Sequence, residues 1–521
     1  MRTFKTDLNE QNIQPLSDDY IKFIRYAQYQ IERSGEGIVA FITNNSFLDG
    51  IIHRQMRKEL LRVFDAIYIV NLHGNRRIKE RTPEGGKDEN VFDVQTGVSI
   101  NIFVKHKELT NTQAKLYYYD LFGSRQAKLE YLSALSLVNI HWHELRPNEP
   151  NYFFVNKNYK HEHEYRKAFS LSDLFEYHGQ GVYSKRDSVA IRYKKQEAVE
   201  LYQNAQILSP EEFRSRYNAG VDKRDWNAEN VIQDLQTSQG VVIVPYLYRP
   251  FDIRYVVYSR KSKGIFAYPC FDTLGSVLHA TNYALCATRQ VRQNQYRHCF
   301  VTNILGDKAS VSDVSHIFPL YKLPDGWNYT PAELVAGKTR NGKPIELELN
   351  MRPEILAKIS EAVGEPVKGE EVFDYVYGVL HDKEYRTKYF EFLKIEYPRI
   401  PYPKDKTEYQ RYVTIGEKLR RLHLMDETLQ IPLITTFDIA GSNQIEYVKY
   451  ADGKVWINDT QYFNNVPLLV WDHYVGAYQP ARLWLQKRIG RRLDFDDVNW
   501  YLRVCATIYE ELNALLARVK S

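Results

Sequence analysis

Three short runs in the first hundred residues have the apolar pattern of buried strands. They cover residues 38–42 (IVAFI), 66–72 (AIYIVNL) and 97–105 (GVSINIFVK). Mostly apolar runs of this length are typical of strands that are covered on both faces, as in α/β folds. The first run ends in a polar turn that leads toward a helix, and doubly wound proteins place ligands at such strand ends.

Helical patterns separate these strands. Apolar residues recur at helical spacing from Tyr20 to Ile31, which predicts a helix over residues 17–31 with Ser17 as its N-cap. A second helix is predicted from about residue 48 to residue 63. One helix and no strand pattern precede the first strand. The order of elements therefore predicts the second half of a doubly wound domain whose first half is absent.

The rest of the chain changes character twice. From about residue 110 the pattern is mostly helical and highly charged, and from Gly240 onward short strands and turns dominate. We therefore predict three regions, at residues 1–112, 113–236 and 237–521. The first is the half-domain, the second is a helical connector and the third is a mixed α+β domain.

Composition fits a folded protein of more than one domain. The chain has 521 residues, of which 44% are hydrophobic and 26% charged, and its length predicts two or three domains. No apolar run approaches the roughly 20 residues that cross a bilayer, so we expect a cytoplasmic protein with no membrane partner. The net charge of +5 permits a nucleic-acid partner without requiring one. The four cysteines lie far apart and indicate neither a disulfide framework nor a zinc site.

A series of segments carries a resemblance to a known family. In chain order they are GEGIVAFITNNSFLDG, AIYIVNLHGN, NVFDVQTGVSINIFVK, YRPFDIRYVVY, ATRQVRQNQYRHCFVTN, FPLY, FLKIEYPRIPYPKD and PLLVWDHYVGAYQPARLWLQKRIGRRL. This series resembles the latter part of the single-chain bacterial N6-adenine DNA methyltransferases. The type ISP restriction-modification enzymes and their type IIG-like relatives are the most similar members. The resemblance runs from about Ser17 to near the C-terminus and includes the specificity, or target recognition, domain.

Two motifs of that family are missing from this chain. Such enzymes bind S-adenosylmethionine on a glycine-rich turn after the first strand, and they hold the flipped adenine with an Asn/Asp-Pro-Pro-Tyr/Phe motif. The sequence contains no Pro-Pro dipeptide, and its best glycine candidate, FEYHGQGVYSK, is interpreted as a connector turn. We therefore expect no catalytic or cofactor-binding residues in this chain, whereas the resemblance implies S-adenosylmethionine as the cofactor of the complete enzyme.

The resemblance also implies how the three strands pair. In the family's sheet the last strand lies antiparallel between the other two, so the strands here form a contiguous half-sheet. The expected fold is thus a partial Rossmann-like methyltransferase half-domain with three remaining strands, followed by a helical connector and a mixed α+β target recognition domain. The strand at 38–42 would expose an unpaired edge. Either the chain is a truncated product, or a polypeptide carrying the N-terminal methyltransferase half supplies the rest.

Residues beside the flipped base can be placed by the same resemblance. The segments FITNNSF and FDVQTG should line a residual target-base pocket, in which an aromatic face stacks on the base. The residues assigned to it are Asn44, Asn45, Phe47, Phe92 and Gln95. Two alternatives remain open, because polar residues at a strand end also serve as a helix cap, and Phe92 fits a core position equally well.

Basic residues with amide and aromatic neighbours predict where double-stranded DNA binds. Arginine suits bidentate contact with guanine, and glutamine or asparagine suits adenine. The predicted DNA-binding residues are Lys185, Arg186, Arg249, Arg254, Arg289, Arg292, Gln293, Asn294, Arg297 and His298. The alternatives are contact with phosphates alone or a solvated strand face, and a structural ion pair between Arg249 and Asp252.

Two histidine-rich stretches, HWH at 141–143 and HEHEY at 161–165, lack the H-E-x-x-H spacing of a zinc helix. They are interpreted as exposed patches, and no metal site is predicted.

The leading hypothesis is a sequence-specific DNA recognition region joined to half of an N6-adenine methyltransferase domain. The alternatives are a standalone DNA-binding specificity subunit without catalysis, and a methyltransferase that a partner chain completes in trans.

Overall fold

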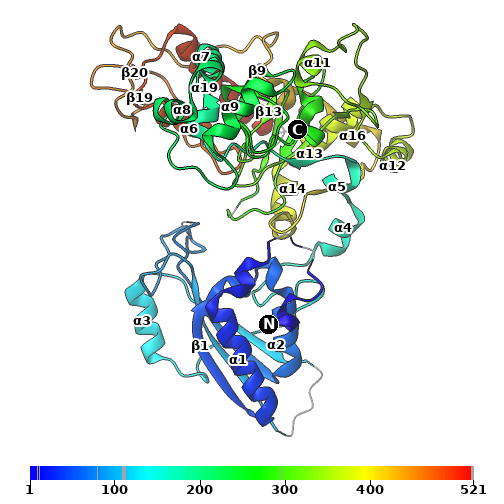
Figure 1. The fold of residues 1–521 in the computed structure, drawn as a ribbon. Coiled ribbons are helices and arrows are strands. Elements are labelled where there is room, and N and C mark those ends of the chain that lie inside the picture. Colours follow the sequence, from blue (N-terminus) through cyan, green and yellow to red (C-terminus); the bar gives the residue numbers. More distant parts are fainter. Residues whose placement is uncertain (9, 11, 79, 108–112, 294, 518–521) are drawn as a thin grey trace. The chain divides into compact units, whose positions relative to one another are not determined.

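The computed structural model describes residues 1–8, 10, 12–78, 80–107, 113–293 and 295–517. The chain divides into two compact units, Met1–Tyr159 and Lys160–Ser521 (Figure 1). Three regions were predicted, with boundaries after residues 112 and 236. Both boundaries lie inside a unit, because residues 113–159 add strands to the first sheet and residues 160–236 pack in the core of the second unit.

A five-stranded sheet forms the centre of the first unit. Its strands are β1 (Gly37–Asn44), β2 (Ala66–His73), β3 (Val98–Lys105), β4 (Lys115–Asp120) and β5 (His143–Leu145), in the order β1-β3-β2-β4-β5. Strand β3 is antiparallel to both β1 and β2, as expected for the three predicted strands. Strands β2 and β4 are parallel, and β5 is antiparallel to β4. The sheet therefore has two strands more than predicted.

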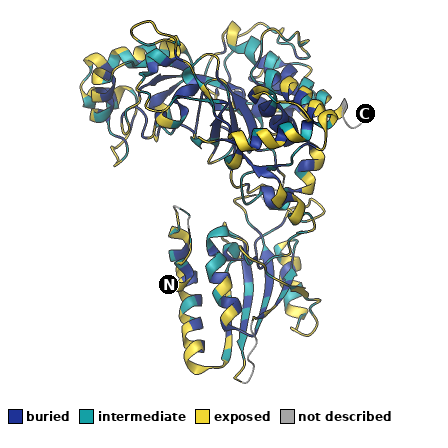
Figure 2. Ribbon diagram, turned by 90° about the vertical axis from the view of Figure 1, so that its right-hand side faces the viewer, coloured by how far each residue is buried: buried dark blue, intermediate teal, exposed yellow. Residues whose placement is uncertain are grey.

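Helices and turns of the first unit surround this sheet. They are η1 (Arg2–Lys5), η2 (Gln14–Ser17), α1 (Asp19–Ser34), η3 (Asn45–Phe47), η4 (Ile51–His53), α2 (Arg54–Val63) and α3 (Arg125–Ala134). The N-cap position of α1 is Asp18 rather than the predicted Ser17. Helix α2 begins at Arg54, later than predicted, because two short 3-10 turns come first. Figure 2 shows exposed residues along the outer side of α1.

The two faces of this sheet differ in burial near β1. On one face Val39, Ile67 and Phe103 are buried against apolar residues of α1 and α2. On the other face Ile38 and Ile42 are 68% and 55% exposed. Strands in α/β sheets are normally covered on both faces. The first unit therefore has an apolar surface at the free edge of its sheet.

The second unit begins with short elements and three longer helices that pack on a sheet. They are α4 (Glu162–Lys167), β6 (Phe169–Ser170), α5 (Leu171–Leu174), β7 (Gly179–Gln180), α6 (Asp187–Ala190), β8 (Ile191–Arg192), α7 (Lys195–Ile207), α8 (Pro210–Arg216), α9 (Ala228–Thr237), β9 (Val242–Arg249) and β10 (Asp252–Tyr258). Leu201 of α7 and Val231 of α9 share one core with Tyr246 and Val256 of the following strands. This part is thus no separate connector.

The middle of the second unit consists of short strands and helices. They are α10 (Phe271–Leu274), η5 (Gly275–Leu278), β11 (Ala284–Ala287), β12 (Cys299–Thr302), β13 (Leu305–Gly306), β14 (His316–Pro319), β15 (Tyr321–Lys322), α11 (Pro331–Ala336), β16 (Glu348–Leu349), α12 (Pro353–Val363), α13 (Gly369–Leu380), α14 (Lys383–Lys388), α15 (Phe390–Leu393) and β17 (Arg399–Ile400). Two four-stranded sheets, β13-β9-β10-β8 and β12-β11-β14-β7, lie in this unit. Their strands are largely buried (Figure 2).

The C-terminal part adds a small sheet and four helices. They are α16 (Lys406–His423), β18 (Lys449–Ala451), β19 (Lys454–Trp456), β20 (Tyr462–Phe463), α17 (Leu468–Trp471), α18 (Pro480–Gln486) and α19 (Phe495–Ala517). Helices α13 and α16 pack closely, because a Cβ atom on Gly416 would lie only 1.8 Å from the carbonyl oxygen of Asp374. Glycine is therefore required at this crossing. Among the residues that the structure describes, no helix is both long and apolar enough to cross a membrane.

Candidate nucleic-acid interface

The arginine-rich stretch forms a hairpin loop between two buried strands. Strands β11 and β12 pair antiparallel, and the last pair of the ladder joins Ala287 to Cys299. Residues 288–298 therefore connect the two strand ends; we call them the 288–298 loop. Every residue of both strands is buried, so the loop extends from a fixed base.

Buried residues within the 288–298 loop hold its backbone in place. Val291 and Tyr296 are buried. The backbone N–H of Val291 donates to the carbonyl of Lys394 at 3.1 Å, and the carbonyl of Arg297 accepts from the N–H of Gly476 at 2.7 Å. These contacts to distant segments of the same unit fix which side chains of the loop face outward.

Five polar side chains of the loop are exposed among its described residues. They are Arg289, Gln290, Arg292, Gln293 and Gln295. Arg292 is 3.6 Å from the carboxylate of Asp313, and both side chains are largely exposed, so this ion pair stabilises little in water. Asn294, also predicted to bind DNA, lies outside the described residues. The exposed residues have the composition that suits contact with bases or phosphates.

The end of the loop differs from the prediction. Arg297 is half-buried, lies 5.3 Å from the ring centre of Tyr474 and donates a hydrogen bond to Gln295. His298 is fully buried, and burial, with nearby Arg386, lowers its pKa to about 3. A neutral, buried imidazole cannot contact a phosphate on the surface, so His298 is a core residue here.

Two predicted arginines on β9 and β10 make ion pairs inside the unit. Arg254 is 5% exposed, and its guanidinium lies 2.9 Å from the carboxylate of Asp252, which also pairs with Arg488 at 2.9 Å. The guanidinium of Arg249 lies 3.1 Å from Asp307. The structural alternative was therefore correct for Arg249 in kind, although its partner is Asp307 rather than Asp252.

The remaining basic pair lies just before α6. Lys185 is exposed, with its Nζ 4.7 Å from the ring centre of Tyr183. Arg186 donates a hydrogen bond to the carbonyl of Val221 and lies 5.4 Å from the ring of Trp226. Lys185 is thus available to a ligand, whereas Arg186 stabilises the neighbouring loop.

In the first unit, the polar turn after β1 combines capping with a contact across the sheet. The side-chain Oδ1 of Asn44 accepts from the N–H of Ser46 at 2.8 Å, which is the capping role left open as the alternative. Asn45 donates through its backbone N–H to the carbonyl of Gly97 at 3.0 Å and through Nδ2 to Asn71 at 2.9 Å. Asn45 therefore joins the ends of β1, β2 and β3.

Asn71 continues a chain of hydrogen bonds along the strand ends. Its Nδ2 donates to the hydroxyl of Tyr118 at 3.0 Å, and that hydroxyl donates to Asp120. Asp120 lies 2.6 Å from His73 Nε2, and Glu80 lies 2.9 Å from His73 Nδ1. We call the six hydrogen-bonded residues the strand-end network: Asn45, Asn71, Tyr118, Asp120, His73 and Glu80.

Charge in the strand-end network is centred on His73. Burial alone would lower the pKa of His73, but the hydrogen bonds to Asp120 and Glu80 raise it to about 9. The ring of Phe122 stacks on the imidazole with 3.8 Å between the ring centroids. His73 is therefore protonated at neutral pH and stacked against Phe122. It lies at the carboxyl ends of the parallel strands β2 and β4, and strand ends of this kind bind ligands in doubly wound proteins.

The aromatic residues assigned to the base pocket have opposite environments. Phe47 is fully buried, with its ring centroid 6.4 Å from each of Tyr20 and Phe154, so it belongs to the core. Phe92 is 44% exposed, and Gln95 is exposed as well. The alternative of a core role for Phe92 does not fit this exposure.

Buried polar groups fix the loop that carries Phe92. Lys128 of α3 is fully buried and donates to the carboxylate of Asp88 at 2.9 Å and to two backbone carbonyls at 2.7 Å. Arg125 donates to the carbonyl of Asn90 at 2.9 Å. Helix α3 therefore positions the exposed Phe92.

The comparison with protein families matches residues 173–512 to the Type ISP C-terminal specificity domain. The match covers more than half of the chain and lies within the second unit. The chain belongs to this family. No curated protein matches the chain.

Solved structures resemble the whole chain in fold. The ATP-dependent Type ISP restriction-modification enzyme LlaBIII bound to DNA aligns with a TM-score of 0.76 and 22% identity, over 99% of this chain and 34% of that one. The DrdV–DNA complex aligns with a TM-score of 0.73 and 21% identity, over 99% of this chain and 53% of that one. The third structure is a nuclease-deletion mutant of the Type ISP restriction-modification enzyme LlaGI in complex with a DNA substrate mimic. It aligns with a TM-score of 0.71 and 20% identity, over 99% of this chain and 49% of that one. This Type ISP chain thus spans about a third to a half of those chains.

Of the strand-end network of this Type ISP chain, only Asn45 was among the predicted site residues. The signals were the polar residues at two strand ends, Asn71 and His73 in VNLHGN and Asp120 in YYYDLF. The second segment lay in the predicted helical connector, so its strand was not recognised. Glu80 stands in a charged loop, where nothing in the sequence distinguishes it from its neighbours.

Proposed function

We propose that the second unit recognises a sequence in double-stranded DNA for a restriction-modification enzyme, and that the 288–298 loop contacts the DNA. The observation that carries the proposal is the set of exposed arginine and glutamine side chains on a loop that buried residues hold in place, within a Type ISP specificity domain. The similar solved structures, which are described as bound to DNA, support it.

Arginine and glutamine can each make two hydrogen bonds to a base edge in the major groove. Arg289 or Arg292 would pair with O6 and N7 of guanine, and Gln293 or Gln295 with N6 and N7 of adenine. Contact with phosphates alone would give affinity without sequence preference. Arg289 makes no ion pair with another described residue, so little electrostatic energy is lost when it turns to DNA.

Selection from a random pool of duplex DNA tests this proposal. The chain should enrich one sequence, and Arg289→Ala with Arg292→Ala should change the enriched bases or abolish enrichment. Arg340→Ala is a matched control, because Arg340 is exposed in a different turn after α11. No enrichment by the wild-type chain would contradict sequence recognition. Enrichment that the double variant leaves unchanged would place recognition elsewhere in the unit.

We propose further that the first unit is the C-terminal half of a Rossmann-like N6-adenine methyltransferase domain. Strand β3 lies antiparallel between β1 and β2, as the resemblance implies. The alignment of 99% of this chain with restriction-modification enzymes also supports this assignment. In the complete enzyme, S-adenosylmethionine would supply the methyl group and the target adenine would be flipped out of the duplex.

The residues present would serve the base rather than the cofactor. The strand-end network and the exposed ring of Phe92 would form one wall of the target-base pocket, in which Phe92 stacks on the adenine. Asn45 would position the turn after β1 through its bond to Asn71. The chain alone would not methylate DNA, because its sequence has neither the glycine-rich turn nor the Pro-Pro motif.

A polypeptide carrying the N-terminal half of the domain, joined to this chain or separate, would complete the sheet at β1. The exposed Ile38 and Ile42 and the free edge of β1 support this proposal. Methylation assays with this chain and such a polypeptide would decide between the alternatives. Methylation by the mixture, but by neither polypeptide on its own, indicates complementation in trans. Sequence-specific DNA binding without methylation indicates a specificity subunit.

A further inference from the structure

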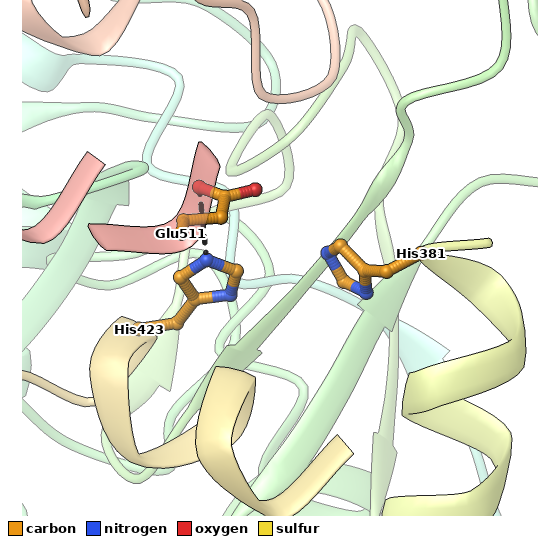
Figure 3. Close-up of side chains that lie close together, drawn as sticks. All are labelled: His381, His423 and Glu511. Carbon is orange, nitrogen blue, oxygen red and sulfur yellow. Dashed lines mark ion pairs between the residues drawn. The ribbon is translucent and has the colours of Figure 1, made fainter. Parts of the chain in front are cut away.

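Four segments of the second unit bring three imidazoles and one carboxylate together in its interior. His381 directly follows α13, His423 ends α16 and Glu511 lies on α19 (Figure 3). His473 lies just after α17 and also contacts Glu511. We call these four residues the histidine–glutamate cluster. They are separated by between 38 and 130 positions in the sequence, so no local sequence motif predicts the cluster.

Two contacts within the cluster have the spacing of metal ligands. The Nε2 atoms of His423 and His473 lie 3.2 Å and 3.4 Å from Oε2 of Glu511. One ligand atom each of His381, His423 and Glu511 lies within 4.8 Å of the others. Bonds of 2.0 to 2.2 Å in a tetrahedral zinc site separate neighbouring ligand atoms by about 3.3 Å. The two shorter distances match that value.

Hydrogen bonding alone explains these contacts poorly. Charge-assisted N–H···O bonds between imidazolium and carboxylate are normally about 2.7 to 2.9 Å long. His423 Nε2, His473 Nε2 and Glu511 Oε2 are buried, and none has a hydrogen bond of acceptable geometry to another described residue. The side chains of His423 and Glu511 are only 1% and 4% exposed. Their contacts are ion pairs, and buried polar atoms without well-formed hydrogen bonds are costly, so three that face one another indicate a shared ligand.

The outer nitrogens of two imidazoles are already occupied. His381 Nδ1 lies 2.9 Å from the carbonyl of Tyr377, and His423 Nδ1 lies 2.5 Å from the hydroxyl of the same residue. A hydrogen bond at one ring nitrogen directs the lone pair of the other toward a metal, as in most histidine metal sites. Figure 3 shows a ring nitrogen of His381 turned toward His423 and Glu511.

We propose that the histidine–glutamate cluster binds one divalent zinc-type cation, with His423, His473, Glu511 and His381 as ligands. Imidazole nitrogens with one carboxylate oxygen suit zinc and its neighbours rather than magnesium or calcium, which prefer oxygen ligands. Four protein ligands leave no open position, and the site is buried, so the ion has a structural role. It joins the ends of α13 and α16 to α19 and the segment after α17.

Metal analysis of the full chain, purified without a histidine tag from cells grown with zinc, tests the proposal. We expect one zinc ion per chain, and a lower melting temperature after chelation that zinc restores. His423→Asn and Glu511→Gln should each remove the metal. His141→Asn with His143→Asn is a matched control that should retain it, because both of these histidines are exposed. A wild-type chain that carries no metal, and whose melting temperature added zinc does not change, would overturn the proposal.

Two measurements remain decisive if the ligand variants fail to fold. Loading the wild-type chain with Co²⁺ should give the intense visible absorption of four-coordinate cobalt with nitrogen and oxygen ligands. The weak absorption of six-coordinate cobalt would exclude the tetrahedral site. Tyr377→Phe keeps every ligand but removes the hydroxyl beside His423, and it should weaken metal affinity about tenfold. Unchanged affinity in that variant would contradict the proposed role of His423 as a ligand.

Discussion

The Nε2 atom of His73 lies 2.6 Å from Oδ1 of Asp120, and this contact joins the ends of the neighbouring parallel strands β2 and β4. His73 also has a positive φ of 52°, which places its ring between the carboxylates of Asp120 and Glu80. One cation thus pairs with two carboxylates at the ends of these strands.

Stability of the first unit should therefore depend on the protonation of His73. The folded-state pKa of about 9 exceeds the ordinary value of 6.5. Protonated His73 thus stabilises the fold fully below about pH 6.5, and this contribution is lost as the pH rises through about 9. His73→Asn tolerates the positive φ but carries no charge, and it should cost on the order of 2 kcal/mol at pH 6.

Hydrogen exchange of the amides in β2 and β4, corrected for intrinsic rates, measures this effect in the full chain. The difference between the wild type and His73→Asn should be large at acidic pH and nearly vanish well above the folded-state pKa. The exposed His141, changed to Asn, serves as the control and should show no such difference. If the difference in amide protection between wild type and variant did not depend on pH, the charge of His73 would not stabilise the sheet.

The salt dependence of DNA binding should report on the 288–298 loop. Each arginine that contacts a phosphate releases counterions, so the log–log salt slope should fall by about 0.9 for each of Arg289→Ala and Arg292→Ala. Fluorescence anisotropy with the selected duplex measures the slope, with Arg340→Ala as the control. A weaker affinity with an unchanged slope would indicate base contact, whereas unchanged affinity would place the DNA on another face.

Arg254 should behave in the opposite way to Arg289. Replacing Arg254 by Met leaves the buried Asp252 with Arg488 as its remaining cationic partner, and this should destabilise the second unit by about 3 kcal/mol. Arg289→Ala should change stability by less than about 0.5 kcal/mol because Arg289 is exposed. Thermal melting checks both values. A variant at Arg254 that melts normally but loses DNA affinity would restore it as a DNA-binding residue.

The sequence predicted the strands best where burial makes them continuously apolar. Strands β1, β2 and β3 begin and end within one or two residues of the predicted runs. Strand β4 was missed because KLYYYD has one aliphatic residue and three consecutive tyrosines between charged ends, in a highly charged region. Its burial comes from pairing with β2, and pairing between distant segments leaves little trace in local composition.

Site residues were predicted by type, and type alone does not determine exposure. Arg254 and Arg289 are both arginines with polar and aromatic neighbours in the sequence. Arg254 is nevertheless buried and shares Asp252 with the distant Arg488, whereas Arg289 is exposed. His298 was grouped with its exposed neighbours although it directly precedes a buried strand. The histidine–glutamate cluster has no local motif, because its members come from four separate segments.

Cofactor binding should be absent in the isolated chain. S-adenosylmethionine needs the glycine-rich turn that lets the backbone approach the ligand, and the sequence has no convincing candidate for that turn. Isothermal titration calorimetry of the chain with S-adenosylmethionine should give no binding heat. Adding the polypeptide that carries the N-terminal half is the positive control. One-site binding at micromolar affinity by this chain alone would contradict the assignment of the first unit as a half-domain.

The free edge of β1 should drive association. Ile38 and Ile42 are largely exposed on β1, which pairs with β3 alone among the described strands. Unpaired strand edges pair readily with other chains. In sedimentation experiments the chain should self-associate with rising concentration, or bind a polypeptide that carries the missing strands.

Burial of each isoleucine should contribute about 2 kcal/mol, so Ile38→Lys with Ile42→Lys should weaken association by at least about a hundredfold. Val138→Lys alters another exposed apolar residue of the same unit and should have no effect. Equal association of the double variant and the wild type would show that the chain associates through another surface.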